Sequence, residues 1–164
     1  MLGAGIQGKT LGIVGLGLIG QATARRAKAF GMEIIYSGRR QADPAVEAEL
    51  GARYVTFDEL LETADVVSLH CPLNAETQHL IDADRLKQMR SDAFLINTTR
   101  GPVVDEQALV DALRAGEIAG AGLDVFETEP LTASPLFDLD NVILTPHQAG
   151  LAQSAKVKIG RAHV

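Results

Sequence analysis

Three segments of the chain contain residue types suited to acid–base chemistry on a small carbonyl compound. They are Asn97-Thr98-Thr99-Arg100-Gly101, the run from Gly122 to Pro130, and Thr145-Pro146-His147. An arginine can bind a carboxylate and polarise a carbonyl, a histidine can donate a proton to the carbonyl oxygen, and a carboxylate can orient the imidazole and favour its charged form. Such a set would suit the reduction of a keto acid by hydride. Isolated residues of these types are more often structural or at the surface, so spacing alone leaves that alternative open.

A glycine motif near the start of the chain predicts a site for a dinucleotide. The apolar run 11–14 is followed at once by Gly15-x-Gly17-x-x-Gly20, and the next residues are typical of a helix to about Phe30. The N-terminus of such a helix offers unpaired N–H groups and the positive end of its dipole to a pyrophosphate. Gly15 permits the tight turn, Gly17 lets the backbone approach the ligand, and Gly20 lets the helix pack closely on the strand. An ordinary glycine turn is the alternative.

The residues after the second expected strand indicate which dinucleotide is preferred. NAD sites commonly place an acidic residue there, where it accepts hydrogen bonds from the ribose 2′-OH. This chain has Ser37-Gly38-Arg39-Arg40 instead. Arg39 and Arg40 can pair with a 2′-phosphate, and Ser37 can donate a hydrogen bond to it. We therefore predict NADP (NADPH) as the preferred cofactor and NAD as a possible one; the alternative is that both arginines belong to a solvated turn.

The elements that must position these residues alternate along the chain. Short apolar runs predict strands at 11–14, 33–36, 53–55, 66–69, 94–97, 120–125 and 142–144. Between them we expect helices that end near 30, that span 44–50, 84–89 and 105–115, and that run from a Thr56-x-x-Glu59 capping box through 61. This order predicts an α/β fold, a doubly wound parallel sheet of the Rossmann type in a single domain. Ligands of such sheets bind at the carboxyl ends of the strands, where all the candidate segments fall.

Composition excludes several classes of function. The chain has 164 residues, of which 46% are hydrophobic and 22% charged, as expected for one globular domain. A net charge of -6 without a basic run argues against a nucleic-acid partner, and no apolar run is long enough for a membrane span or resembles a signal sequence. The single cysteine, Cys71, cannot form an internal disulfide, so we expect a reducing cytoplasm. His70 and His79 lack the spacing of metal ligands, and we expect no metal site.

Five segments together resemble a known family. GKTLGIVGLGLIG, HCPLNAETQHLI, FLINTTRG, GAGLDVFETEP and NVILTPH occur in this order, from Gly8 to about Ser154. They are similar to the nucleotide-binding domain of the D-isomer-specific 2-hydroxyacid dehydrogenases, and SGRR is most similar to the NADP-preferring glyoxylate and hydroxypyruvate reductases among them. The resemblance implies hydride transfer between nicotinamide and a small 2-keto acid, such as glyoxylate or hydroxypyruvate. It also implies a homodimer that packs through this domain.

The resemblance assigns roles to individual residues. It implies that Arg100 binds the substrate, that His147 donates the proton and that Glu129 pairs with the histidine. Glu127 is the competing carboxylate, but the family pattern places the functional one directly before the proline. Asp124 is expected to contact the nicotinamide carboxamide.

The same resemblance extends to the walls of the cofactor cleft. The residues expected there are Ile19, Cys71, Pro72 and Thr98, with Thr77 near the phosphates or the adenosine. Leu18 departs from the family pattern, because many relatives carry an arginine after the second glycine. Backbone N–H groups are therefore expected to make more of the phosphate contact.

Family members also have a substrate domain that covers the cleft, and we expect that domain to be missing from this chain. The expected nucleotide-binding domain covers 1–158. The last residues, 159–164 (IGRAHV), resemble a translated sequencing adapter and are expected to be a non-native tail, the alternative being the natural start of a final helix. Without the lid, the site is open to water and the fragment is expected to turn over little or nothing. A dinucleotide-sensing binding module, like the corepressor branch of the family, is the remaining alternative.

Overall fold

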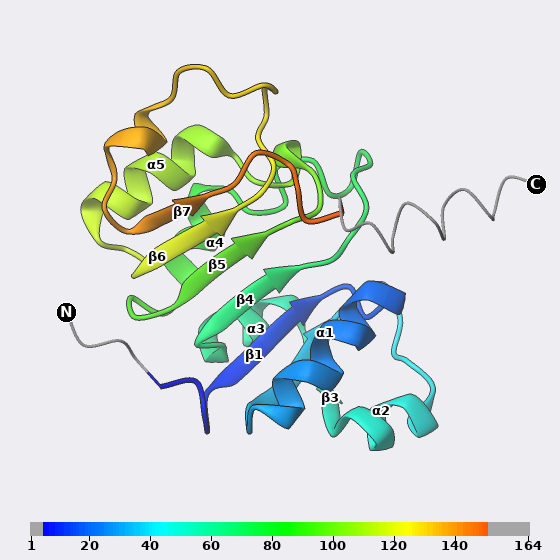
Figure 1. Cartoon of the computed structure of the whole chain (residues 1–164). Helices are drawn as coiled ribbons and strands as arrows, with labels where there is room; N and C mark the ends of the chain where they lie inside the picture. The colour runs from blue at the N-terminus through cyan, green and yellow to red at the C-terminus, as the bar shows by residue number, and fades with distance from the viewer. Residues whose placement is uncertain (1–4, 151–164) are drawn as a thin grey trace, which may run out of the picture.

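A seven-stranded parallel sheet forms the centre of the computed structural model, which describes residues 5–150. Its strand order is β3-β2-β1-β4-β5-β6-β7 (Figure 1). The strands are β1 (Thr10–Val14), β2 (Glu33–Ser37), β3 (Ala52–Tyr54), β4 (Val66–Leu69), β5 (Phe94–Asn97), β6 (Gly120–Leu123) and β7 (Val142–Leu144). The predicted domain end at 158 and the predicted tail at 159–164 lie outside the described residues.

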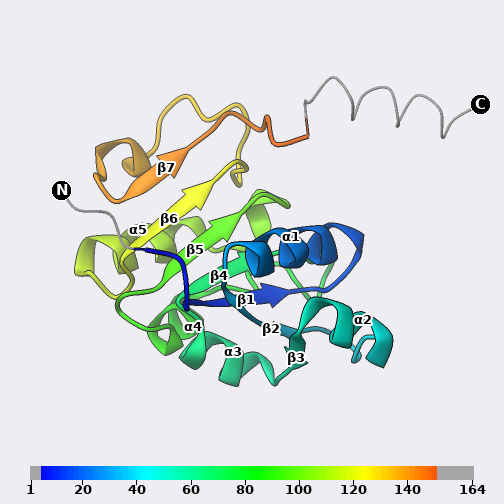
Figure 2. The ribbon, with the colours of Figure 1, turned by 60° about the horizontal axis from the view of Figure 1, so that its bottom comes forward.

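Helices cover both faces of the sheet, which confirms the predicted doubly wound α/β fold. They are α1 (Leu18–Ala29), α2 (Pro44–Leu50), α3 (Phe57–Thr63), α4 (Ala83–Gln88) and α5 (Glu106–Ala115), with two short 3₁₀ helices, η1 (Gly101–Val103) and η2 (Pro135–Asp138). Helix α1 packs on β1 and β2 and against α2, whereas α3, α4 and α5 pack in a row on the opposite face (Figure 2). No helix among residues 5–150 is both long and apolar enough to cross a membrane.

The strands are nearly continuous apolar runs because each one contributes to two cores. Successive side chains of a strand point to opposite faces of the sheet. Ile13 and Tyr36 pack in the cluster beneath α1, which includes Ala24. Their neighbours Val14 and Ile35 pack in the larger cluster beneath α3, α4 and α5. This two-sided burial is the physical origin of the sequence pattern from which the sheet is predicted.

Element boundaries differ from the sequence predictions by a few residues. Strand β6 ends at Leu123 rather than at 125, and the last bond to β5 is the one that Asp124 N donates to Asn97 O at 3.0 Å. The capping box is half formed: Thr56 accepts from the N–H of Glu59 at 3.1 Å, while the Glu59 carboxylate binds Arg53. The two 3₁₀ helices were not predicted, since a single turn leaves no periodic pattern.

The sheet reverses its order at β1, which lies between β2 and β4. Helices on opposite faces then diverge and leave a crevice at the carboxyl ends of these strands, where ligands of doubly wound sheets bind. Thr98, His70 and the glycine turn all follow strands that end at this edge.

Candidate active site and dinucleotide-binding cleft

The glycine turn after β1 needs glycine at two of its three positions for its own geometry, and the predicted approach of Gly17 to a ligand stays a prediction. Gly15 has φ +97°, in the region that favours glycine. A Cβ on Gly20 would lie 2.5 Å from Gly15 O, so α1 approaches the turn too closely for a side chain. A Cβ on Gly17 would meet nothing within 4 Å and would project into open space. Helix α1 begins at the next residue without a side-chain cap, so its first N–H groups remain available to a ligand.

A cavity of about 590 Å³ lies beside this turn. It is lined by Ile19, His70, Cys71, Pro72, Leu73, Thr98, Thr99 and Arg100, and so brings together five of the residues predicted for the cofactor cleft and the substrate. Leu18 and Ile19 are strongly exposed at the start of α1, with 87% and 72% of their surface accessible. Burial raises the pKa of the Cys71 thiol and lowers that of the His70 imidazole, so both groups are neutral near neutral pH.

Thr77 does not line this cavity. Its hydroxyl donates to Pro72 O at 2.6 Å and accepts from Asn74 N at 2.8 Å, which braces the loop between β4 and α4. Its predicted position near the phosphates or the adenosine stays a prediction.

The segment after β2 lies directly beside the glycine turn. Gly15 N donates to Ser37 O at 2.8 Å, and Ser37 is buried. Arg39 and Arg40 are exposed, and within residues 5–150 neither guanidinium forms a hydrogen bond or an ion pair. The residues of this edge therefore fit a dinucleotide: the glycine turn and α1 offer N–H groups to phosphates, and the two arginines offer free positive charge.

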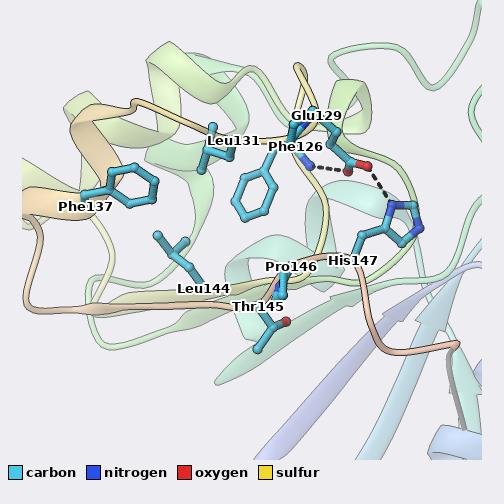
Figure 3. A pocket seen from close by; sticks show the side chains of 9 residues that line it. Phe126, Glu129, Leu131, Phe137, Leu144, Thr145, Pro146 and His147 are labelled. Atoms are coloured by element: carbon cyan, nitrogen blue, oxygen red, sulfur yellow. Dashed lines mark hydrogen bonds and ion pairs between the residues drawn. The ribbon is translucent and has the colours of Figure 1, made fainter.

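Glu129 and His147 form a close pair beyond β6 and β7. Glu129 Oε2 lies 2.7 Å from His147 Nδ1, and Glu129 Oε1 accepts from Phe126 N at 3.0 Å (Figure 3). The hydrogen bond from His147, that from Phe126 N and the positive charge of Arg100 together hold the pKa of Glu129 below its usual range. Because an ionised carboxylate only accepts hydrogen bonds, Nδ1 must carry a proton. Figure 3 shows the other ring nitrogen, Nε2, turned away from Glu129.

Asp124 holds the loop that carries His147. The buried carboxylate accepts from Thr145 Oγ1 and Gln148 N through Oδ1, and from Ala149 N through Oδ2. Burial by itself would raise the pKa of Asp124, but these three hydrogen bonds outweigh it and keep the pKa below the ordinary value. His147 has φ +49°, a backbone conformation that costs a non-glycine residue about 1 kcal/mol or more. The hydrogen bonds of Asp124 with residues on both sides of His147 stabilise this conformation.

The predicted contact of Asp124 with the nicotinamide carboxamide stays a prediction. The buried carboxylate accepts three hydrogen bonds from the loop, two on Oδ1 and one on Oδ2. The hydrogen bond from Thr145 to Asp124 was not predicted from the sequence, although Thr145 stands in the segment that was singled out for His147.

Arg100 is positioned by two residues to which the sequence analysis gave no role. The buried Asn97 accepts from Thr99 N at 3.0 Å and donates to Arg100 O at 3.0 Å, which bends the chain as it leaves β5. A Cβ on Gly101 would lie 1.9 Å from the carbonyl carbon of Phe126, so the two segments touch backbone to backbone. This contact brings Arg100 towards the segment of Glu129. In the sequence, the glycine directly after the candidate arginine was the signal for this close contact between the two segments.

Glu127, the competing carboxylate, faces a different histidine. Its Oε1 lies 2.8 Å from His79 Nε2 and accepts from Glu106 N at 3.2 Å, at the start of α5. The geometry therefore joins Glu129, and not Glu127, to His147. Within residues 5–150, no group of three or more histidine, cysteine or acidic side chains is arranged to hold a metal ion.

A second cavity, of about 500 Å³, lies against the Glu129–His147 pair. Its other walls are mostly apolar and come from the segment after β6 and from the end of β7: Phe126, Pro130, Leu131, Phe137, Leu144, Thr145 and Pro146 (Figure 3). Because the walls of this second cavity are mostly apolar, they offer few polar partners to the pair. Since Nδ1 is bound to Glu129, Nε2 is the ring nitrogen of His147 through which the pair can interact with a polar ligand.

Known proteins share both the sequence and the fold. Residues 1–149 match the family described as "D-isomer specific 2-hydroxyacid dehydrogenase, NAD binding domain". A glyoxylate reductase of Thermococcus litoralis is 56% identical over 155 residues, which are 94% of this chain and 46% of the relative. The crystal structure of a glyoxylate reductase from Paecilomyes thermophila superposes with a TM-score of 0.93 at 44% identity, over 98% of this chain and 48% of that one.

An acyclic imino acid reductase in complex with NADPH and D-Arg is similar as well, with a TM-score of 0.86 at 38% identity over 96% of this chain and 49% of that one. The chain thus spans about half the length of the curated relatives that it matches. Proteins with different named substrates share this half, so the half by itself does not specify a substrate.

Proposed function

The chain belongs to the D-isomer-specific 2-hydroxyacid dehydrogenase family, and on this basis we propose that it is the nucleotide-binding part of an NADP-preferring oxidoreductase that reduces a small 2-keto acid. The observation that carries the proposal is the Glu129–His147 pair, with its 2.7 Å contact, at the sheet edge that also holds the glycine turn. Glyoxylate is the proposed substrate, because relatives that are 56% and 55% identical to this chain are named glyoxylate reductase, and hydroxypyruvate is the second proposed 2-keto acid.

Each group of the chain has a distinct proposed task. A bound nicotinamide supplies the hydride. Arg100 binds the carboxylate of the keto acid and polarises its carbonyl, while His147 donates a proton to the carbonyl oxygen from Nε2. Glu129 holds the imidazole through Nδ1 and stabilises the charged ring. Asp124 keeps His147 in place through the loop that it binds.

The proposed preference for NADP depends on Arg39 and Arg40. Both arginines are exposed in the segment that follows Ser37, whose carbonyl accepts from Gly15 N in the glycine turn. Their guanidiniums can pair with a 2′-phosphate, and no carboxylate occupies the segment Ser37 to Arg40 to repel it. The structural relative that was solved with NADPH supports the same preference. NAD remains a possible second cofactor.

Turnover tests the proposal. We would join the chain to the half of the Thermococcus litoralis relative that it does not match, and follow the loss of NADPH absorbance with glyoxylate and hydroxypyruvate. The rate should fall about 10²-fold or more in His147→Ala. His79→Ala, which removes the other histidine paired with a glutamate, should stay close to the parent rate. Tight NADPH binding without turnover of any 2-keto acid would instead support a dinucleotide-sensing module.

A further inference from the structure

Two tyrosines fix the backbone on either side of the arginine pair. The Tyr54 hydroxyl donates to Gly38 O at 2.8 Å, directly before Arg39. The Tyr36 hydroxyl accepts from Ala42 N at 2.8 Å, two residues after Arg40. The segment 38–42 is therefore held at both ends, with the arginines between the two attachment points.

The two tyrosines also support each other. Tyr36 and Tyr54 are partners in the register of β2 and β3, and their ring centroids are 5.2 Å apart. Tyr36 is fully buried, whereas Tyr54 is 37% exposed at the end of the edge strand β3. Removing the Tyr54 hydroxyl therefore changes an attachment of the segment without opening the core.

The carboxylate that contacts Tyr36, that of Glu47, accepts hydrogen bonds from neutral donors. Glu47 Oε1 accepts from the Tyr36 hydroxyl at 2.6 Å, and both oxygens of Glu47 accept from Gln41 Nε2 at 3.0 and 3.1 Å. Arg39 and Arg40 do not pair with this carboxylate, so their charges remain available. Directly before the segment, Gly15 N donates to Ser37 O, which ties this part of the chain to the glycine turn.

A fixed backbone matters for the affinity of this segment for an anion. Long side chains lose conformational freedom when they bind a ligand, and a backbone that is already ordered lowers the total entropy lost. If one end of the segment were released, its backbone would also have to be ordered when a 2′-phosphate binds, and this additional loss of entropy would weaken the binding. It would leave the contacts of the glycine turn with the rest of a dinucleotide intact.

We propose that the Tyr54 hydroxyl, supported by Tyr36, determines the preference for NADP by holding residues 38–42 so that Arg39 and Arg40 face a 2′-phosphate. The inference rests on the proposed cofactor preference and deepens it. Tyr54 acts here as a positioning residue, through the backbone of Gly38.

Isothermal titration of the chain with NADPH and with NADH tests this role, with Tyr54→Phe as the variant. The substitution keeps the ring and removes only the hydroxyl. We expect the Kd for NADPH to rise about three- to tenfold, the effect of one hydrogen bond, and the Kd for NADH to change much less. A role in stability alone would weaken both cofactors equally, and that result would overturn the inference.

The same substitution in an Arg39→Ala/Arg40→Ala background is the matched control. Because Tyr54 is proposed to act through the arginines, its substitution should have no further effect on NADPH binding there. Equal affinities of the unaltered chain for NADPH and NADH would refute the proposed preference and this inference with it. A preference for NADPH that disappears in the arginine variant but survives Tyr54→Phe would refute the inference alone.

Discussion

The Nδ1 atom of His147 lies 2.7 Å from Glu129 Oε2, which leaves Nε2 as the ring nitrogen that can exchange a proton with a ligand. The hydrogen bond keeps the pKa of Glu129 low, so the carboxylate is ionised wherever the site would work near neutral pH. This single contact fixes both the tautomer and the direction of the imidazole, as required for a proton donor.

Removing the charge of Glu129 should impair the chemical step. In the completed protein described above, we expect Glu129→Gln to lower kcat about 10²-fold, because the imidazolium loses its ionised partner. Glu127→Gln removes an equal charge two residues away, from the carboxylate that binds His79, and should leave kcat nearly unchanged. Steady-state kinetics with glyoxylate check both. Equal losses in the two variants would contradict the assignment.

The low pKa of Glu129 predicts how its contribution to stability depends on pH. A carboxyl group with a lowered pKa in the folded state stabilises the fold above the ordinary pKa of glutamate, and this contribution is lost as the pH falls through the folded value. The stability difference between the unaltered chain and Glu129→Gln should therefore shrink between about pH 6 and about pH 3. Urea unfolding across this range, with carboxyl ¹³C NMR of Glu129, measures the effect. A difference that grows on acidification would be inconsistent with the structure.

Asp124→Asn should destabilise the chain and release the His147 loop. An amide has one acceptor oxygen in place of two, and its NH₂ would face the N–H of Ala149 or that of Gln148. We expect a loss of about 1 to 3 kcal/mol in the free energy of unfolding near neutral pH, because a buried group loses partners. Thr145→Val, which removes only the hydroxyl donor, should cost less. Since the pKa of Asp124 is lowered, the difference between the unaltered chain and Asp124→Asn should decrease as the pH falls below the ordinary range of aspartate.

Two glycines of the same turn should respond in opposite ways to alanine. Gly17→Ala places its Cβ in open space, so thermal stability should be retained while dinucleotide binding weakens. Gly20→Ala forces a Cβ to within 2.5 Å of Gly15 O and should lower the melting temperature. Calorimetric melting and NADPH titration of both variants test the contrast. A Gly17→Ala chain that binds NADPH as tightly as the parent would place the phosphates elsewhere.

Most of the fold could be predicted from the sequence because local patterns encode it. The apolar runs of β1 and β2 reflect burial on both sheet faces. The helices predicted at 44–50 and 105–115 are each followed by a glycine, Gly51 and Gly116, in the left-handed conformation that favours this residue. The end of β6 could not be predicted from local pattern, because Val125 is as apolar as the strand before it. The strand ends where its pairing with β5 and β7 ends, at Leu123, which depends on distant segments of the chain.

The site could be predicted only in part, because several of its contacts join distant segments. Arginine, carboxylate and histidine each follow a strand, and spacing places them at one sheet edge. Spacing does not distinguish Glu127 from Glu129, since the difference lies in which histidine each one meets. Nor does it show that Asp124 binds a loop more than twenty residues away, or that Tyr54 on β3 reaches Gly38 after the neighbouring strand β2. Those relationships exist only after the chain has folded.

The arginine pair should control the choice of cofactor. Arg39→Ala and Arg40→Ala together should weaken NADPH binding by about tenfold or more and NADH binding much less, because only NADPH carries the 2′-phosphate. Arg26→Ala/Lys28→Ala, which removes two charges from the far end of α1, is a control of equal charge. Equal losses for both cofactors would contradict the proposed role of Arg39 and Arg40.

We propose that the edge of the sheet around the glycine turn binds a nicotinamide dinucleotide and prefers the phosphorylated form. Calorimetric titration of the unaltered chain with NADPH and then with NADH tests this preference without any substrate. We predict binding of both, with NADPH favoured by about tenfold or more, or about 1.4 kcal/mol. Tighter binding of NADH, or binding of neither dinucleotide by the folded chain, would contradict the account.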